Sequence, residues 1–295
     1  MLINIENIYI QSLKALSING IQTDILRLDL VHPIISGNKW FKLKYYLEEA
    51  VEQNAQCLAS FGGAYSNHIV ALACAGYEKG ITTKGFIRGD QTTPLSPTLL
   101  EAKQYGMELV FVDRTTYRDK DAIIHQYHQP GIYWIPEGGY GKLGAKGAGD
   151  ILSTADTSGY DYIICATGTG TMLSGLIQSA QDNQNILGIS VLKNHHSLMS
   201  EVASLNYSNK DMAFGSIQGY DFGGYAKHTQ SLIDFMNELW LADQLPTDFV
   251  YTAKLCYGVR DMIQTNQILP GNHLLLIHSG GLQGNRSLGA GKLLF

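Results

Sequence analysis

Short apolar runs alternate with amphipathic segments along most of the chain. Leu43, Tyr46, Leu47 and Ala50 recur at helical spacing, which predicts a helix over residues 39–53. Similar segments predict helices that begin at Ser66 and that span 97–105, 120–128, 171–181, 196–204, 228–242 and 253–264. The apolar runs between them predict strands at 57–61, 84–88, 108–113, 132–135, 161–166, 186–192 and 273–278.

Strands that alternate with helices predict an α/β fold, with parallel sheets covered by helices on both faces. Ligands of such folds bind at the carboxyl ends of the strands. Pairs of glycines follow several predicted strands, which indicates close approach of the backbone to a ligand there. A glycine-rich stretch over residues 136–149 is the best candidate for a crossing between two domains.

Composition limits the possible functions. The 295 residues suffice for one large or two ordinary domains, and the net charge of −5 comes without a basic stripe, which argues against nucleic-acid binding. The longest dense apolar run, residues 273–278, is far too short to cross a bilayer. Four cysteines lie far apart, so neither a disulfide framework nor a metal site is expected, and a reducing cytoplasm fits best.

Lys39 is the first candidate for chemistry. Gly37-Asn38-Lys39 ends a predicted loop and opens a predicted helix. A helix N-terminus disfavours an ammonium and so lowers the pKa of a lysine, which suits an amine that must react with a carbonyl. From this feature alone a solvated lysine is the more common interpretation, and Lys42 or Lys44 would serve equally well.

Two further strand–helix junctions could bind anions. Ser66-Asn67-His68 opens a helix whose backbone N–H groups could hold a carboxylate, although a plain helix cap has the same pattern. Residues 167–171, with the sequence Thr-Gly-Thr-Gly-Thr, follow a strand and open a helix, which favours a phosphate site over a simple glycine turn. The loop lacks the lysine of a P-loop and the third glycine of a dinucleotide site.

The order of these motifs resembles the 1-aminocyclopropane-1-carboxylate (ACC) deaminase / D-cysteine desulfhydrase family, over about residues 27–286. That family has a Gly-Asn-Lys triplet whose lysine binds pyridoxal 5'-phosphate (PLP), with a second lysine where Lys42 stands here. Trp40-Phe41 departs from the usual family sequence. The family's Gly-Gly-x-x-Ser-Asn-(Gln/His) motif matches Ser66, Asn67 and His68, which implies substrate contacts for all three and a cofactor contact for Asn67.

The same resemblance assigns the remaining site residues. Tyr225 and Tyr251 match tyrosines on the substrate side of the cofactor ring, and Ser279 matches the residue that faces the ring nitrogen. Thr252 stands where ACC deaminases carry a glutamate and D-cysteine desulfhydrases carry a threonine. The phosphate loop of the family corresponds to Thr167, Gly168, Thr169, Gly170 and Thr171.

The resemblance implies a PLP enzyme of fold type II, with two parallel-sheet α/β domains and the cofactor in the cleft between them. The large domain would comprise residues 1–42 and 139–295, and the small domain residues 43–138. The catalytic residues would be Lys39, Ser66, Tyr225 and Tyr251. The expected reaction is α,β-elimination from a small D-amino acid such as D-cysteine, in a homodimer. ACC deamination, PLP binding without catalysis, and nucleotide binding at residues 168–171 are the alternatives.

Overall fold

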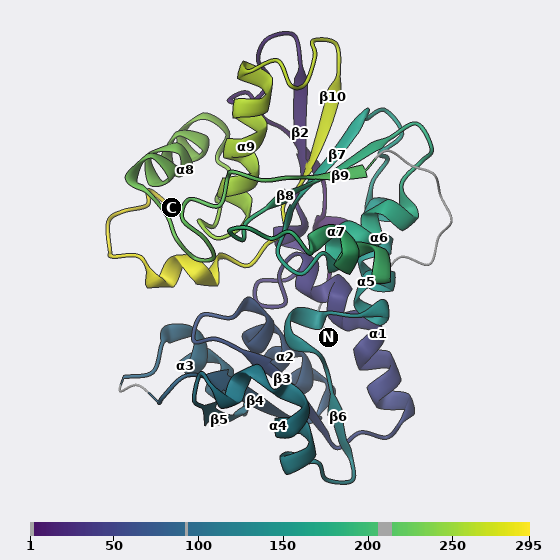
Figure 1. The fold of residues 1–295 in the computed structure, drawn as a ribbon, viewed down its shortest axis with the longest axis vertical. Coiled ribbons are helices and arrows are strands. Elements are labelled where there is room, and N and C mark those ends of the chain that lie inside the picture. Colours follow the sequence, from purple (N-terminus) through teal and green to yellow (C-terminus); the bar gives the residue numbers. More distant parts are fainter. Residues whose placement is uncertain (1–2, 92–93, 206–213) are drawn as a thin grey trace.

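The computed structural model describes residues 3–91, 94–205 and 214–295, which form an upper and a lower lobe, each built on its own sheet (Figure 1). The strands are β1 (Ile10–Ser12), β2 (Gln22–Leu26), β3 (Cys57–Gly62), β4 (Thr82–Arg88), β5 (Glu108–Val112), β6 (Ile132–Trp134), β7 (Tyr162–Thr167), β8 (Asn185–Ser190), β9 (Phe214–Ile217) and β10 (His273–Ile277). The α-helices are α1 (Asn38–Glu52), α2 (Asn67–Lys79), α3 (Pro97–Gln104), α4 (Lys120–Tyr127), α5 (Lys142–Gly149), α6 (Thr171–Ser179), α7 (Leu198–Leu205), α8 (Gln230–Asp243) and α9 (Thr252–Gln264).

The upper lobe contains a six-stranded sheet in the order β1-β2-β10-β7-β8-β9. Its central strands are parallel, and alternate residues of β7 enter different cores. Ile163 and Cys165 pack with α6, whereas Ile164 and Ala166 pack with α8 and α9. Figure 1 shows the helices on both sides of this sheet accordingly. Two-sided burial explains why these strands are almost uniformly apolar.

The lower lobe contains a four-stranded parallel sheet in the order β5-β4-β3-β6. Leu58 and Ile87 face α1, α2 and α3, while Phe61 and Phe86 face α4 on the other side. Ser66 caps the N-terminus of α2, where its hydroxyl oxygen accepts a hydrogen bond from Ile69 N–H. The carboxyl ends of β3 and β4 therefore carry the loops that approach the upper lobe.

The predicted fold class is confirmed, and each predicted strand and helix is present with ends within two residues. Ser96 caps the N-terminus of α3. The sheets are parallel as expected, and β1 adds an antiparallel strand at one edge, where it pairs with β2. The sequence did not predict β1, β2, β9 or α5. Cys165 is buried in β7, whereas Cys57 is half-buried at the start of β3.

Helix α5 lies in the stretch that was expected only to cross between domains. Its glycines let α5 pack closely against α1 and α6, since a Cβ at Gly147 would collide with the carbonyl oxygen of Phe41. The predicted domain boundary at residues 42 and 43 falls inside α1, and the boundaries stay a prediction. In the described ranges, no helix has the length and apolar character that a bilayer crossing needs.

Candidate active site

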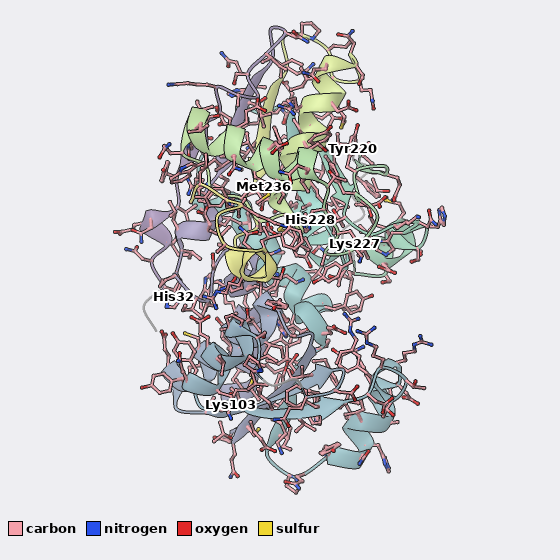
Figure 2. The ribbon with its side chains drawn as sticks, turned by 90° about the vertical axis from the view of Figure 1, so that its left-hand side faces the viewer. His32, Lys103, Tyr220, Lys227, His228 and Met236 are labelled. Carbon is pink, nitrogen blue, oxygen red and sulfur yellow. The ribbon has the colours of Figure 1, made fainter. Side chains whose placement is uncertain are left out.

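A cavity of about 820 Å³ lies where the carboxyl ends of both sheets face each other, and both lobes contribute to its wall. Each site residue expected from the sequence lines this cavity. These residues are Lys39, Ser66, Asn67, His68, Thr167, Gly168, Thr169, Gly170, Thr171, Tyr225, Tyr251 and Ser279. Residues 225–227 belong to the upper lobe, and Figure 2 shows Lys227 and His228 there. The structure thus brings these residues together, while their individual roles stay predictions.

Lys39 lies in the first turn of α1, as expected, and its Nζ donates a hydrogen bond of 2.7 Å to Asn38 Oδ1. The Nζ atom also lies 5.9 Å from the centroid of the Tyr251 ring. Burial lowers the pKa of Lys39 to about 8, and the negative charge of Asp248 opposes this shift. Desolvation of the ammonium is therefore the main cause of the lowered pKa.

On the expectation that Lys39 binds PLP, its pKa predicts how fast PLP attaches to the cofactor-free protein. A free amine is required, so the attachment rate should rise about tenfold per pH unit below pH 8 and level off above it. Absorbance of bound PLP, recorded between pH 6 and 10, measures the rate. Asp248→Asn should move the midpoint to lower pH, because the carboxylate charge raises the pKa of Lys39. A rate that still climbs steeply at pH 10 would contradict the lowered pKa.

A second buried amine, Lys42, lines the same cavity one helical turn after Lys39. Burial, together with the charge of Lys39, holds the pKa of Lys42 well below its usual range. Among the described residues that line the cavity, Glu137 is the one carboxylate, and it pairs with Lys120 (3.0 Å). A bound dianion such as a phosphate would therefore supply the missing negative charge.

His68 is a neutral side chain in the cavity wall. Ser60 Oγ donates to the carbonyl oxygen of Ile135 (2.7 Å), so it accepts from His68 Nε2 (2.8 Å), which must carry the proton. Burial and the charges of Lys39 and Lys42 lower the pKa of His68 to about 3. Its Nδ1 atom has no partner among the described atoms. His68 can thus accept a hydrogen bond from a ligand, but it offers no positive charge to a carboxylate.

Ser66 and Asn67 stand at the entrance of α2. Asn67 Nδ2 donates 2.8 Å to the carbonyl oxygen of Gly281, which ties the lower lobe to the loop after β10. Asn67 Oδ1 is buried and has no partner in the described part of the chain. The first backbone N–H groups of α2 have no carbonyl within the helix to bind, and they adjoin the cavity. This arrangement suits a carboxylate ligand.

The phosphate-loop candidate is a tight turn between β7 and α6. Gly170 adopts a left-handed conformation (φ +71°) directly before the first residue of α6, Thr171. The hydroxyls of Thr169 and Thr171 lie 3.0 Å apart, and Thr167 and Thr171 are buried. Hydroxyl and N–H donors at a helix N-terminus, in a cavity with excess buried amines, fit the phosphate of PLP.

Tyr225 and Tyr251 meet on the upper wall of the cavity. Their hydroxyl oxygens lie 3.4 Å apart, and their rings cross edge to face with centroids separated by 6.1 Å. Burial and the neighbouring Tyr225 hydroxyl raise the pKa of Tyr251 well above its usual range. Both tyrosines are therefore protonated hydrogen-bonding groups at neutral pH.

Ser279 follows β10 and lines the cavity, while Thr252 lies behind it, fully buried, with 3.5 Å between their hydroxyl oxygens. Asp248 lies deeper still and does not line the cavity. Its carboxylate accepts hydrogen bonds from the backbone N–H groups of Val250, Tyr251 and Thr252 and thereby fixes the start of α9. Asp248 was not among the predicted site residues, because it precedes the predicted helix at residues 253–264 by five positions and so does not show the usual N-cap pattern.

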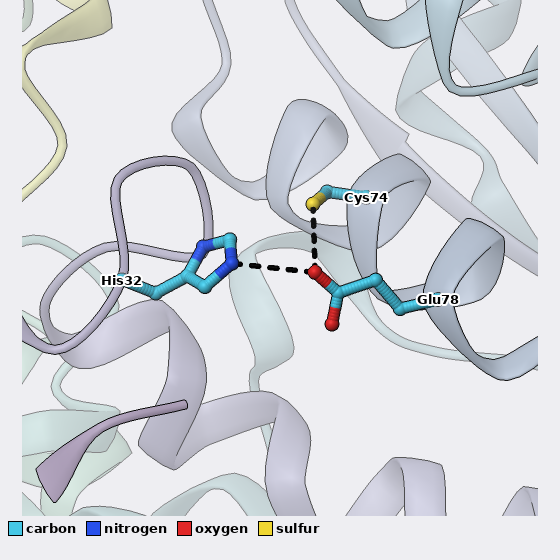
Figure 3. A group of neighbouring side chains, drawn as sticks. All are labelled: His32, Cys74 and Glu78. Atoms are coloured by element: carbon cyan, nitrogen blue, oxygen red, sulfur yellow. Dashed lines mark hydrogen bonds and ion pairs between the residues drawn. The ribbon is translucent and has the colours of Figure 1, made fainter. Parts of the chain in front are cut away.

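A separate cluster joins His32, Cys74 and Glu78 near the level at which the lobes meet (Figures 2 and 3). His32 Nδ1 accepts hydrogen bonds from the N–H groups of Ile34 and Ile35, so the proton of the neutral ring sits on Nε2, 3.3 Å from Glu78. A protonated nitrogen cannot bind a metal ion. Burial raises the pKa of Cys74 to about 11, so its thiol is protonated when no metal ion is bound. The cluster links the loop before Lys39 to α2.

The two-lobed fold places the Lys39 amine and the N-terminus of α6 on one cavity, an arrangement suited to an enzyme with a phosphorylated carbonyl cofactor. The family model described as pyridoxal-phosphate dependent enzyme matches residues 7–280. The chain therefore belongs to the PLP-dependent enzymes of this family, and PLP is its cofactor.

Relatives and solved structures agree with this assignment. A Thermotoga maritima protein provisionally named as an ACC deaminase is 28% identical, covering 93% of this chain and 94% of the relative. A bifunctional D-cysteine desulfhydrase/ACC deaminase of Arabidopsis thaliana, named as mitochondrial, is 26% identical over 90% of this chain and 74% of its own. A crystal structure of an ACC deaminase homologue is 26% identical, with a TM-score of 0.80 over 97% of this chain and 92% of that one. The predicted resemblance to this group and the fold type II architecture are confirmed.

Proposed function

We propose that this enzyme catalyses α,β-elimination from a small D-amino acid with a leaving group on Cβ. With D-cysteine and water, the products would be pyruvate, ammonia and hydrogen sulfide. The supporting observation is the neutral hydroxyl pair of Ser279 and Thr252 at the end of β10. The preference for the D-enantiomer rests on the resemblance to D-cysteine desulfhydrases.

The cavity offers a place for each part of PLP. Lys39 would bind the cofactor covalently, Thr167, Gly168, Thr169, Gly170 and Thr171 would hold its phosphate, and Asn67 and Ser279 would hold its ring. When bound, PLP supplies an electron sink for the negative charge that develops on the substrate Cα.

The strength of this sink depends on the group that holds the ring nitrogen. A carboxylate would stabilise a protonated nitrogen, whereas the hydroxyl of Ser279, with Thr252 behind it, is neutral. Asp248 is the acidic residue nearest to Thr252 in the sequence. Three backbone N–H groups bind its carboxylate away from the cavity. A weak sink suits elimination, because the leaving group takes the electron pair from Cβ.

The remaining residues would bind the substrate and move its protons. The N–H groups at the start of α2, with Ser66 and Asn67, would bind the α-carboxylate. Lys39 would take the Cα proton, because its pKa of about 8 leaves part of the amine free at neutral pH. Ser66 would assist this transfer. Tyr225 and Tyr251 would contact the substrate side of the ring, and His68 would accept a hydrogen bond.

ACC deamination is the second candidate, because the Thermotoga maritima and Arabidopsis thaliana relatives both carry this activity in their names. Opening a cyclopropane without a leaving group requires strong stabilisation of negative charge. That chemistry gains most from a carboxylate partner of the ring nitrogen. Thr252 therefore favours elimination over ring opening in this chain.

The decisive measurement compares kcat/KM for D-cysteine, β-chloro-D-alanine, their L-enantiomers and ACC, by keto-acid release from the PLP-loaded enzyme. We expect the two D-amino acids to give pyruvate, with ACC at least about 100-fold poorer, a difference of roughly 3 kcal/mol in transition-state stabilisation. Thr252→Glu should narrow this ratio. If ACC were the better substrate, the ring-nitrogen argument would be wrong. Bound PLP without any keto acid would point to a non-catalytic PLP protein.

Two expectations about the setting of the enzyme stay proposals. Four free cysteines, three of them buried, fit a protein of the reducing cytoplasm. A homodimer is expected from the resemblance alone, and light scattering on the purified protein would test it.

A further inference from the structure

The mouth of the cavity is rich in positive charge. Arg88, at the end of β4, and Arg114, after β5, line the cavity from the lower lobe, and Lys227 lines it from the upper lobe. A recess of about 430 Å³ adjoins the cavity and shares Arg88, Arg114 and Glu137 with it. Arg118 and Lys120 also line this recess.

Glu137, the carboxylate that lines both the cavity and the recess, already has partners. Lys120 pairs with Glu137 at 3.0 Å, and the Tyr117 hydroxyl donates to the other carboxylate oxygen of Glu137 at 3.1 Å. In the described ranges, Arg88, Arg114 and Arg118 have no carboxylate partner. The chain as a whole has more acidic than basic residues, 26 against 21, so this local excess of cations is not a general property of its surface.

Like charges held together repel each other, and a bound anion removes that repulsion. Arginine is also the side chain best suited to bind phosphate, sulfate or carboxylate oxygens in pairs. The proposed sites for the cofactor phosphate and for the α-carboxylate lie elsewhere, at the N-termini of α6 and α2. The cations at the mouth are therefore available for a third anion.

Arg88 stands close to the place where a substrate side chain would emerge. A Cβ on Gly63 would lie 3.8 Å from Arg88 Nη2, and Gly63 begins the turn that leads to Ser66 and Asn67. An amino acid held by its carboxylate at α2 can therefore direct a short β-substituent toward Arg88. Its guanidinium also lies 5.9 Å from the Tyr117 ring, at the edge of the recess.

We propose that Arg88 and Arg114 bind an oxyanion on the β-substituent of the substrate, so that the enzyme prefers amino acids with a phosphorylated, sulfated or similarly anionic leaving group. This proposal deepens the proposed elimination and rests on it. For O-phospho-D-serine, Lys39 takes the Cα proton and the Cβ–O bond breaks, with its electron pair leaving on phosphate. Hydrolysis of the remaining fragment then gives pyruvate and ammonia.

Calorimetric binding to the PLP-loaded enzyme tests this site without turnover. The probe is 2-amino-3-phosphonopropionate, with each enantiomer tested separately, because its C–P bond provides no leaving group. The reference is 2-aminobutyrate, whose side chain carries no charge. We expect the phosphonate to bind at least about tenfold more tightly than the reference, and Arg88→Gln to weaken the phosphonate alone by about 10- to 100-fold. Arg114→Gln should act in the same direction. Lys103→Gln removes an exposed charge of the same lobe that lies away from the cavity (Figure 2), and it should change neither affinity.

Kinetics provide the second arm. Arg88→Gln should lower kcat/KM for O-phospho-D-serine by about 10- to 100-fold and leave β-chloro-D-alanine within about threefold. Equal losses for both substrates, or no loss for either, would overturn the proposal. So would inorganic phosphate binding as tightly as the phosphonate, with the same dependence on Arg88, because the site would then serve a free anion. A lack of keto acid from every substrate would refute the elimination itself, while the binding arm would still report on Arg88.

Discussion

Replacing Lys39 by alanine should abolish covalent PLP attachment and lower kcat for keto-acid release by about 10³-fold or more. On the proposed function, the variant loses both the amine that would attach the cofactor and the group that would take the Cα proton, and a positioned proton-transfer group alone contributes about 10²- to 10⁴-fold. The Lys39 amine lies 5.9 Å from the centroid of the Tyr251 ring in the cavity wall, and its pKa is lowered to about 8. Absorbance of the purified variant and keto-acid release measure the two losses.

Borohydride reduction of the PLP-loaded native enzyme, followed by peptide mapping, should place the pyridoxyl group on Lys39. Lys44→Ala is the matched control, because Lys44 lies on the same helix but pairs with Asp150 at 2.6 Å and does not line the cavity. It should keep both the cofactor and the activity. A label on Lys42 or Lys44 would refute the assignment of Lys39.

Replacing Gly37 by alanine should cause a large loss of stability, although the side chain added is only a methyl group. Gly37 has φ +62°, and a Cβ there would collide with the carbonyl group of Ser279. The same carbonyl oxygen accepts a hydrogen bond of 3.0 Å from Asn38 N–H, so the start of α1 is docked directly on the end of β10. We expect the free energy of unfolding to fall by about 3 kcal/mol, from the left-handed backbone and the collision together.

Gly271→Ala serves as the control that separates the effect of the positive φ from the effect of the steric collision. Gly271 also has a positive φ (+89°), but a Cβ there would have nothing within 4 Å. Its loss should be limited to the backbone strain of about 1–2 kcal/mol. Thermal unfolding of both variants, with PLP occupancy measured in parallel, compares them. If Gly37→Ala were no less stable than Gly271→Ala, the close approach of Gly37 to Ser279 would carry no cost.

The strand–helix order and the site motifs could be predicted from the sequence because both depend on local patterns. Apolar runs indicate strands that are buried on two faces. Helices are indicated by apolar residues at helical spacing and by N-cap residues such as Ser66 and Ser96. The motif residues lie at strand–helix junctions, and parallel strands bring such junctions to one edge. The roles of those residues were inferred from the resemblance, because each motif alone could also be a solvated lysine, a helix cap or a glycine turn.

Strand β2 and helix α5 could not be predicted, because their sequences do not favour these structures by themselves. Contacts with residues far away in the sequence stabilise them. Asp24 is buried in β2, where its carboxylate accepts hydrogen bonds from Ser12 (2.7 Å) and Tyr160 (2.7 Å) and lies 2.9 Å from His273. A buried carboxylate without those partners would be costly, so an isolated polar run does not suggest a central strand. Similarly, the glycines of α5 disfavour a helix until its close packing on α1 and α6 is known.

The sequence alone therefore determined the α/β class, the cofactor lysine as a candidate and the junctions that would face the cleft. Only the tertiary structure decided the electrostatics of that cleft. Burial lowers the pKa of Lys39, and burial also keeps His68 neutral. Arg88 and Arg114 became candidates only when folding placed them on the wall that Lys39 also lines. Desolvation and charge pairing depend on which residues meet in space, and the order of residues along the chain does not state that.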